Sequence, residues 1–313
     1  MARPILDEET NFVYISDKLR VFFPEFHDAL TEKFSEMHIH FGILHGTKDI
    51  WCRDYMPIQM NDMSFVGYKF DPDYLKENFG HSEYTEYESK YSPIGARLRP
   101  WERVSALSEI SVSHGIDISS RLRNFNIVLD GGNLVFCGNY VIVADKILKE
   151  NKQSRDELES ILREMFNLEP IIVHWEPDHE DVYGHTDGMF RALPTKKDEK
   201  PKLLYLHRWD SPSKRLRDNL RETAGDRIEL KEIVFEKKGP GIDSLAWAYI
   251  NFLQVGRKIL VPKFGLADED SVMDQFHSCF GIKPESIEMP DIARQGGALH
   301  CLTWNIKNEN KRE

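Results

Sequence analysis

Cysteine is scarce in this 313-residue chain, with four residues far apart and no Cys-x-x-Cys pair. A disulfide framework or a structural zinc site is therefore not expected, and reduced thiols in the cytoplasm are. No apolar run approaches the roughly 18 residues that a membrane-spanning helix needs. The first twelve residues have no apolar stretch behind a basic one, so no secretory signal is expected either. We therefore expect a cytoplasmic protein without a membrane partner.

Positive charge is also in deficit. The chain has 41 Lys and Arg against 52 Asp and Glu, for a net charge of -11. This balance disfavours binding of nucleic acid or of an anionic membrane through bulk charge, whereas a small cationic ligand would be tolerated. Hydrophobic residues make up 41% of the chain and aromatic residues 11%. These fractions are sufficient for a sizeable core and exclude wholesale disorder.

Short strand patterns alternate with helix patterns along the chain, which favours an α/β architecture. The expected strands cover 63–70, 126–129, 133–136, 140–144, 170–174, 202–207, 228–235, 248–253 and 258–261, the last two joined in a hairpin at Gly256. Capping residues and amphipathic spacing predict four helices. They lie at about 26–37, from Ser154 to about Phe166, from Ser211-Pro212 onward, and from Asp268 or Asp270 to near Gly281.

The strand-strand-helix-strand rhythm recurs at intervals of roughly 60 residues, too long for small solenoid repeats. No low-complexity linker divides the chain, so we expect a single domain, 1–313. Segment 78–103 breaks the rhythm, since it is rich in Tyr, Glu, Gly and Pro without a period. We interpret it as a long loop and a candidate lid over the site.

Four segments place reactive side chains within apolar surroundings, and three of them contain glycines that allow a close backbone approach. They are 49–57, 129–133, 183–191 and 296–304. Four such places in one chain indicate a single site assembled from several loops.

Cys301 follows two glycines and a histidine, which makes it the best candidate nucleophile among the four thiols. A nucleophilic cysteine needs a stabilised thiolate, because a free thiol with a pKa near ~8.5 is mostly protonated at neutrality. The alternative is a small buried apolar residue, as we expect for Cys52, Cys137 and Cys279. His300 is adjacent to Cys301 in sequence, so in a strand it would point to the opposite face.

His185 and Asp187 stand at i and i+2, so in an extended segment both side chains would share one face. Together they could transfer protons and bind a cation, although a capped turn with a surface histidine would look the same. Asp54 is a candidate to face a planar cation, with Trp51 as an apolar or cation–π wall. A purely structural pair between Arg53 and Asp54 is the alternative.

The four segments together resemble the guanidino-group-modifying enzymes, specifically the agmatine deiminase and Porphyromonas-type peptidylarginine deiminase family. That family carries W-x-R-D-x-x-P, acidic-Gly-Gly-Asn, G-H-x-D, Y-x-N-F, V-P-x-F-G and G-G-x-x-H-C in this order. The matching residues here are 51–57, 130–133, 184–187, 249–252, 261–265 and 296–301. Departures are aspartate where glutamate is commoner at Asp130, Trp304 where glutamine is common, and a different segment 67–71.

The resemblance implies a five-bladed, pseudo-symmetric α/β propeller (a pentein) with the site at its centre. It implies that Cys301 attacks the guanidinium carbon and that His185 protonates departing ammonia and then activates water. Asp54 and Asp187 would hold the guanidinium, and Asp130 would orient His185, although its Gly-Gly segment could equally be a simple turn. No metal or organic cofactor is implied.

The sequence says less about the part of the substrate beyond the guanidinium group than about that group itself. The substrate-binding candidates are Trp51, Arg53, Asp54, Asp187 and Asp181, which stands four positions before His185 and could instead belong to a solvated acidic loop. We favour agmatine, converted to N-carbamoylputrescine and ammonia on the route to putrescine, over peptidylarginine or free arginine.

Two other classes of protein are alternatives. A metal-dependent hydrolase could use the histidines 38, 40 and 45 near the first acidic segment, or the histidines 174, 179 and 185 of a single stretch, although 37–41 also fits an edge strand with exposed histidines. A non-catalytic propeller would keep the fold without the chemistry, but every inferred catalytic position is filled here. The sequence does not determine the oligomeric state.

Overall fold

The computed structural model describes most of the chain. The described residues are 2–73, 105, 107–114, 116–176, 183–196, 198–207, 211–235, 245–266 and 269–311. The expected loop 78–103 and the expected substrate-binding residue Asp181 lie outside them.

The described residues form five small sheets, and every sheet follows one rule. Its first strand pairs antiparallel with the second, and the second pairs parallel with the third. In this order the strands are β3 (Ile58–Gln59), β4 (Phe65–Lys69) and β6 (Leu122–Val128); β7 (Val135–Cys137), β8 (Tyr140–Ala144) and β9 (Glu169–Val173); β10 (Phe190–Leu193), β11 (Lys202–His207) and β12 (Glu229–Val234); β13 (Leu253–Val255), β14 (Lys258–Lys263) and β15 (Glu285–Glu288); β16 (Thr303–Ile306), β1 (Phe12–Ser16) and β2 (His40–His45). The last sheet, extended by β5 (Ser111–Val112), combines both ends of the chain and so closes the ring.

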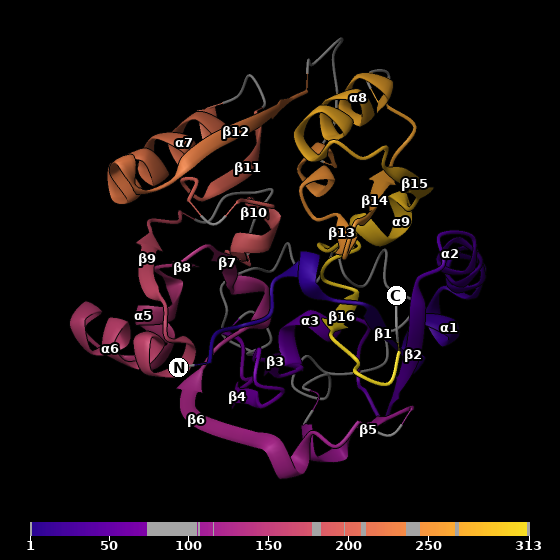
Figure 1. The fold of residues 1–313 in the computed structure, drawn as a ribbon, viewed down its shortest axis with the longest axis horizontal. Coiled ribbons are helices and arrows are strands. Elements are labelled where there is room, and N and C mark those ends of the chain that lie inside the picture. The colour runs from indigo at the N-terminus through magenta and orange to yellow at the C-terminus, as the bar shows by residue number, and fades with distance from the viewer. Residues whose placement is uncertain are drawn as a thin grey trace.

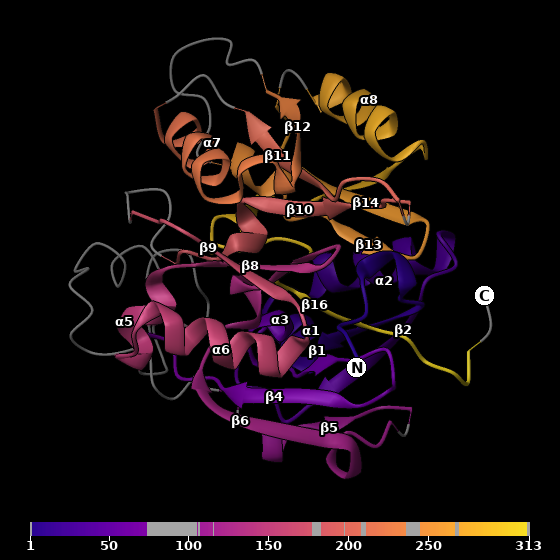
Figure 2. The same cartoon turned by 60° about the vertical axis from the view of Figure 1, so that its left-hand side comes forward.

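Helices connect the second strand to the third in four of these blades and lie on the outside of the ring (Figures 1 and 2). These helices are α1 (Asp17–Phe22), α2 (Pro24–Glu36), α5 (Lys146–Asn151), α6 (Arg155–Phe166), α7 (Ser211–Ala224) and α8 (Glu269–Phe280). Two short helices, α3 (Cys52–Tyr55) and α9 (Pro290–Ala293), instead precede the innermost strands β3 and β16. Short 3-10 turns are η1 (Asp7–Glu9), η4 (Leu107–Glu109), η5 (Ser119–Arg121), η6 (Gly131–Asn133), η7 (Thr186–Gly188), η8 (Gly225–Arg227) and η9 (Ala246–Tyr249). The predicted five-bladed α/β propeller of strand-strand-helix-strand repeats is confirmed.

Helix α6 shows how local sequence sets an element. The Ser154 hydroxyl accepts the backbone N–H of Glu157, and the Glu157 carboxylate accepts the backbone N–H of Ser154, so the predicted capping box is confirmed. The helix ends where Asn167 adopts a left-handed conformation at φ 54°. Leu158 and Leu162, four residues apart on one face, are fully buried against the sheet.

The expected strand 248–253 is wrong in its first half. The chain forms η9 instead, where Ala248 N–H donates to Leu245 O and Asn251 N–H donates to Ala248 O, both at 3.0 Å. Strand β13 begins only after this turn, and the predicted hairpin at Gly256 follows it. The other expected strands overlap observed ones. The turn matters because it brings Asn251 to the centre of the ring.

The hydrophobic core consists of five clusters, and each cluster joins side chains of two neighbouring blades. Tyr14 and Phe65, for example, belong to adjacent blades and both pack against Trp304. Trp304 therefore serves the core, and its indole N–H donates to Pro57 O at 2.8 Å. In the described part of the chain, no helix is both long and apolar enough to cross a bilayer.

Candidate active site

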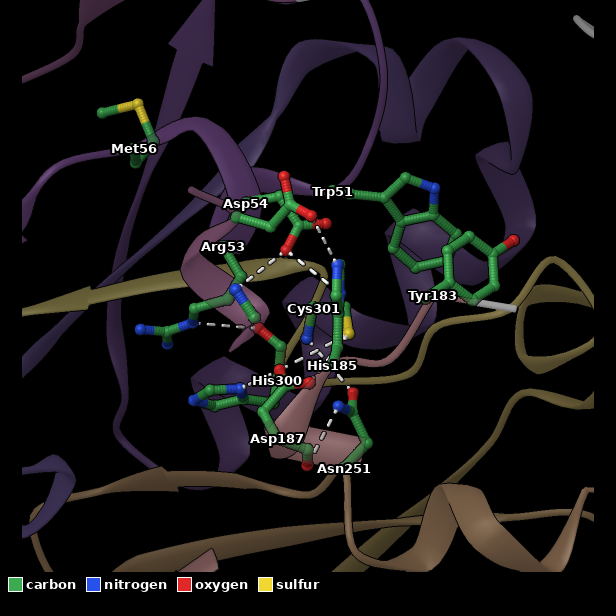
Figure 3. A network of polar contacts seen from close by, with 12 residues as sticks. Trp51, Arg53, Asp54, Met56, Tyr183, His185, Asp187, Asn251, His300 and Cys301 are labelled. Carbon is green, nitrogen blue, oxygen red and sulfur yellow. Dashed lines mark hydrogen bonds and ion pairs between the residues drawn. The ribbon is translucent and has the colours of Figure 1, made fainter. Parts of the chain in front are cut away.

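The reactive side chains come from equivalent positions in the five blades. Each one lies on a short turn immediately before the innermost strand of its blade. Asp54 lies in α3 before β3, Asp130 precedes η6 and β7, Asp187 lies in η7 before β10, Asn251 follows η9 before β13, and Cys301 lies in a turn before β16. Because the innermost strands surround one axis, residues up to 247 positions apart converge there (Figure 3).

The imidazole of His185 lies between two of these carboxylates. Its Nε2 is 3.1 Å from Asp130 Oδ2, and its Nδ1 is 3.5 Å from Asp54 Oδ1. Burial alone would lower the pKa of His185, but the charge of Asp54 and the hydrogen bond to Asp130 outweigh it and raise this pKa to about 9. His185 is therefore an imidazolium at neutral pH.

Lys146 holds Asp130 from the other side. The Lys146 ammonium donates to Asp130 Oδ2 and to Tyr183 O, both at 2.8 Å, and is 3% exposed. Burial opposes ionisation of Asp130, but Lys146 and His185 together hold its pKa well below the usual range. Asp130 is therefore an anion in contact with His185.

Compared with Asp130, the buried carboxyl of Asp54 has fewer neighbours that stabilise its negative charge. Its Oδ1 accepts the backbone N–H of Gly132 at 2.9 Å. Burial raises its pKa to about 7, and the negative charges of Asp130 and Asp187 act in the same direction. A cation placed beside Asp54 would offset both effects and ionise it.

Cys301 is held by its backbone. Its N–H and that of Ala298 both donate to Asn251 Oδ1 at 3.1 Å, and its Sγ lies 3.6 Å from Asp187 Oδ2. Burial raises the pKa of the Cys301 thiol well above its usual range, with Asp187 and Asp54 adding to the effect. The free protein therefore holds a neutral thiol that donates to Asp187.

Asp187 is ionised because His300 donates to it. His300 Nδ1 lies 2.6 Å from Asp187 Oδ2, and this hydrogen bond lowers the pKa of Asp187 although burial opposes it. The pKa of His300 falls to about 4, because of burial and the nearby guanidinium groups of Arg191 and Arg53. A neutral imidazole therefore donates to a charged carboxylate.

Two expectations about side-chain direction are wrong. His300 does not lie in a strand, because Leu302 N–H donates to Ala298 O and closes a turn. This turn directs His300 to Asp187 rather than away from the site. His185 is extended, but Asp187 lies in the 3-10 turn η7, so the two do not share one face of a strand.

The candidate Trp51 and the candidate Arg53 lie on different sides of the site. Trp51 packs so closely on Gly297 that a Cβ there would lie 2.3 Å from the indole, and Figure 3 shows Tyr183 beside Trp51 near the Cys301 sulfur. Arg53 points away from that sulfur, and its Nε donates to the backbone O of His300 at 3.5 Å. Arg53 therefore contacts the turn that carries Cys301 rather than the Cys301 sulfur.

Several contributors carried little or no sequence signal. Asn251 is marked only by the Y-x-N-F resemblance. For His300 the sequence gives no sign of its contact with Asp187. Lys146, Arg191 and Asp7 had no signal at all. A lysine directly after the buried strand β8 could have indicated a buried cation, since burial of a lysine requires a partner.

The first histidine group of the metal-site alternative, 38, 40 and 45, lies away from this centre, whereas His185 of the second group is part of it. His38 adopts a left-handed turn, and His40 and His45 are exposed at the two ends of β2. The expected edge strand 37–41 is wrong at 37–39, because β2 begins only at His40. At residues 40–41 it is an edge strand among the described residues, since they pair with β1 alone and β5 pairs only with Leu44 and His45. Among the described residues, no three His, Cys, Asp or Glu side chains are grouped as metal ligands.

Known proteins resemble this chain in sequence and in fold. Residues 2–306 match the family of Porphyromonas-type peptidyl-arginine deiminases. The agmatine deiminase of Pseudomonas fluorescens is 24% identical over 251 residues, which cover 67% of this chain and 64% of that protein. The solved C. jejuni agmatine deiminase has 16% identity and a TM-score of 0.64, covering 98% of this chain and 97% of that one.

A more distant fold match is DDAH from Pseudomonas aeruginosa, with a TM-score of 0.53, 10% identity and 95% of this chain covered, against 99% of that chain. At such identities the solved structures show the α/β propeller fold alone. The family match is broader, since it spans nearly the whole chain. The chain therefore belongs to the Porphyromonas-type peptidyl-arginine deiminase family.

Proposed function

We propose that this protein is a cysteine-dependent deiminase that hydrolyses the guanidinium group of a small cationic compound. The observation that carries the proposal is the contact of the Cys301 thiol with Asp187 beside the buried carboxyl of Asp54. A thiol in this setting is inert unless a cation arrives. A guanidinium is planar, cationic and resonance-stabilised, so it both requires fixed carboxylates and supplies the missing charge.

Substrate binding would activate the nucleophile. With the guanidinium held by Asp54 and Asp187, its positive charge stabilises the ionised form of Asp54 and lowers the pKa of the Cys301 thiol. The carboxyl groups of Asp54 and Asp187 are buried beside Cys301, so they favour a positively charged partner. Orientation of the carbon toward Sγ supplies much of the rate acceleration.

The chemical steps balance without a cofactor. The Cys301 thiol first loses its proton to solvent. The thiolate forms a C–S bond to the guanidinium carbon, and His185 donates its proton to the departing nitrogen, whose bond to that carbon breaks as it leaves as ammonia. His185, now neutral, takes a proton from water as the oxygen attacks the thiouronium carbon. Collapse breaks the C–S bond and releases a ureido product. Asp130 and Lys146 keep the imidazole in place throughout.

Agmatine is the first substrate to test. The 24% identical relative is named an agmatine deiminase, and the net charge of -11 favours a dication. Asp181 is our candidate for the distal amine. A deiminase of peptidylarginine or free arginine is the second candidate, since the family description names peptidyl-arginine. Trp51 would pack against the substrate in either case.

Ammonia release from agmatine, arginine and an arginine peptide tests the proposal. The purified protein should release ammonia and a ureido product from one of them, with agmatine the fastest. Cys301→Ala should abolish turnover, whereas Cys137→Ala should retain it, because that thiol is buried in the core between two other blades. Absence of turnover on all three compounds, or equal activity of Cys301→Ala, would contradict the proposed function.

A further inference from the structure

A cavity of about 110 Å³ lies on the axis of the propeller. The innermost strands of all five blades line it, and His300, Arg53, Arg191 and Asp7 contribute to its wall. Figure 1 shows the N-terminal segment, which carries Asp7 in η1, at the centre of the ring. His300 thus separates two buried regions, with Asp187 on one side and a charged cavity on the other.

Charged groups surround the imidazole of His300 on both sides. Nδ1 donates to Asp187, whereas Nε2 lies 3.9 Å from Asp7 Oδ2. Asp7 is already paired with Arg191, whose side chain is 3% exposed. Arg53 is 9% exposed, and its Nη2 is buried without a hydrogen-bond partner among the described residues. Two cations and one anion therefore face the cavity side of His300, with Glu8 half-buried at the rim.

We propose that Arg53 and Arg191 are positioning residues for the substrate: their charges keep the imidazole of His300 neutral, so that Asp187 presents an uncompensated carboxylate to the guanidinium. This inference rests on the proposed function for its substrate, and on the contacts around His300 for its cause. Neither arginine touches the reacting atoms, since both act through His300.

The state of His300 decides the charge that the substrate meets. A neutral imidazole that donates one N–H leaves Asp187 with its full negative charge, whereas an imidazolium at 2.6 Å would form an ion pair and cancel it. With an ordinary pKa near 6.5, His300 would be mostly charged at pH 6. With a pKa of about 4, only about 1% is charged at that pH.

Arg53 and Arg191 differ in the other contacts that their side chains make. Arg191 donates to Phe252 O at 2.6 Å and stacks on the Phe252 ring at 4.5 Å, so its loss would also disturb β13. Arg53 makes one long side-chain hydrogen bond, to His300 O, and its outer nitrogen is free of partners in the described residues. Arg53→Met is therefore the sharper test, and Arg53→Lys is its matched control because it keeps the charge.

NMR titration of the His300 imidazole tests the proposal without any substrate, because it measures the pH at which the ring takes up a proton. The His300 resonance is identified by its loss in His300→Asn. Arg53→Met should increase the proton affinity of His300 roughly tenfold, Arg53→Lys should leave it unchanged, and Arg191→Met should act in the same direction if it folds. An unchanged His300 titration in Arg53→Met would overturn the proposal.

Calorimetric binding of agmatine gives the second readout, in a Cys301→Ala background so that no turnover occurs. Between pH 7.5 and pH 5, Arg53→Met should lose about twofold more affinity than Arg53→Lys, because about half of the His300 side chains become charged at pH 5 and neutralise Asp187. Parallel pH profiles in the two variants would overturn the proposal. Failure of the unaltered protein to bind or hydrolyse any guanidino compound would contradict the proposed function instead, while the NMR titration still decides the state of His300.

Discussion

Asn251 holds the turn that carries Cys301. Its side-chain oxygen accepts two backbone N–H groups of that turn, those of Ala298 and Cys301, at 3.1 Å each. Its own backbone O accepts the N–H of His300 at 3.0 Å, and its Nδ2 donates to Asp187 O at 3.5 Å. One amide thus fixes the nucleophile relative to the carboxylate that would bind the substrate.

Asn251→Ala should therefore lower both kcat and the free energy of unfolding. Two buried N–H groups lose their acceptor, which costs about 1–3 kcal/mol for each group that water does not reach. The Cys301 turn then loses its position, and a displacement of about 1 Å can cost on the order of 100-fold in rate. Kinetics and urea unfolding measure both effects.

Asn305→Ala is the matched control for this variant. Asn305 is a buried asparagine on an innermost strand, and its Nδ2 donates to Gln254 O at 2.8 Å. Its loss leaves one buried acceptor unpaired, so it should lower stability by about 1–3 kcal/mol and leave kcat unchanged. Equal loss of kcat in Asn251→Ala and Asn305→Ala would show that Asn251 contributes stability only.

Local sequence patterns predict the alternation of strands and helices and the candidate site segments, whereas the family resemblance implies the five-bladed arrangement and the residue roles. The reacting residues Cys301, His185 and Asp54 stand beside glycines or directly before buried strands, and both features are visible as local patterns. The capping box of α6 is local as well. Such features can be predicted because the residues that cause them are neighbours in the chain.

The supporting residues could not be predicted in the same way. Lys146, Arg191 and Asp7 act through partners 16 to 184 positions away, and nothing near them in sequence marks those contacts. The turn at His300 could not be predicted, because a segment of about four residues has too few positions to distinguish a turn from a strand by its composition. Propensity decides little at such lengths, whereas tertiary contacts decide much.

Gly132 is required by the space between Asp54 and His185. A Cβ on Gly132 would lie 2.6 Å from Asp54 Oδ1 and 2.7 Å from His185 Nδ1. Gly132→Ala should therefore push the carboxylate and the imidazole apart and lower kcat/KM by at least about 100-fold, with a stability loss of about 1–3 kcal/mol.

Gly188→Ala provides the comparison in steady-state assays. Its Cβ would meet Trp247 at 3.5 Å, an ordinary contact, although Gly188 lies in the same turn as Asp187. We expect kcat/KM within a few-fold of the parent protein. A Gly132→Ala enzyme with unchanged kcat/KM would contradict the proposed roles of Asp54 and His185.

Substrate affinity should depend on pH through Asp54. Its raised pKa of about 7 means that the free carboxyl is protonated below that pH and ionised above it. A cation requires the ionised form, so in a Cys301→Ala background the affinity for agmatine should fall by up to tenfold for each pH unit below about 7. Isothermal titration calorimetry across pH 5.5 to 8.5 measures it.

Asp54→Asn should bind agmatine weakly and without this step in affinity near pH 7. Asp62→Asn is its control, because Asp62 lies in an exposed turn where it accepts hydrogen bonds from Ser64. It should keep the pH dependence of the parent. If the change in agmatine affinity near pH 7 persists in Asp54→Asn, then a group other than Asp54 causes it.

The Cys301 thiol should ionise only when a guanidinium is bound. Burial and the charges of Asp187 and Asp54 raise its pKa well above the usual range, so the free protein should show no Cys301 thiolate absorbance near 240 nm at pH 8 to 9. Guanidinium chloride at non-denaturing concentration places a cation between the two carboxylates and should make that absorbance appear. Cys301→Ser corrects for the other thiols, and tetramethylammonium, which is cationic but not planar, should have no effect. A thiolate signal from Cys301 in the free protein would mean that the nucleophile is activated before the substrate arrives, contrary to the electrostatics of this site.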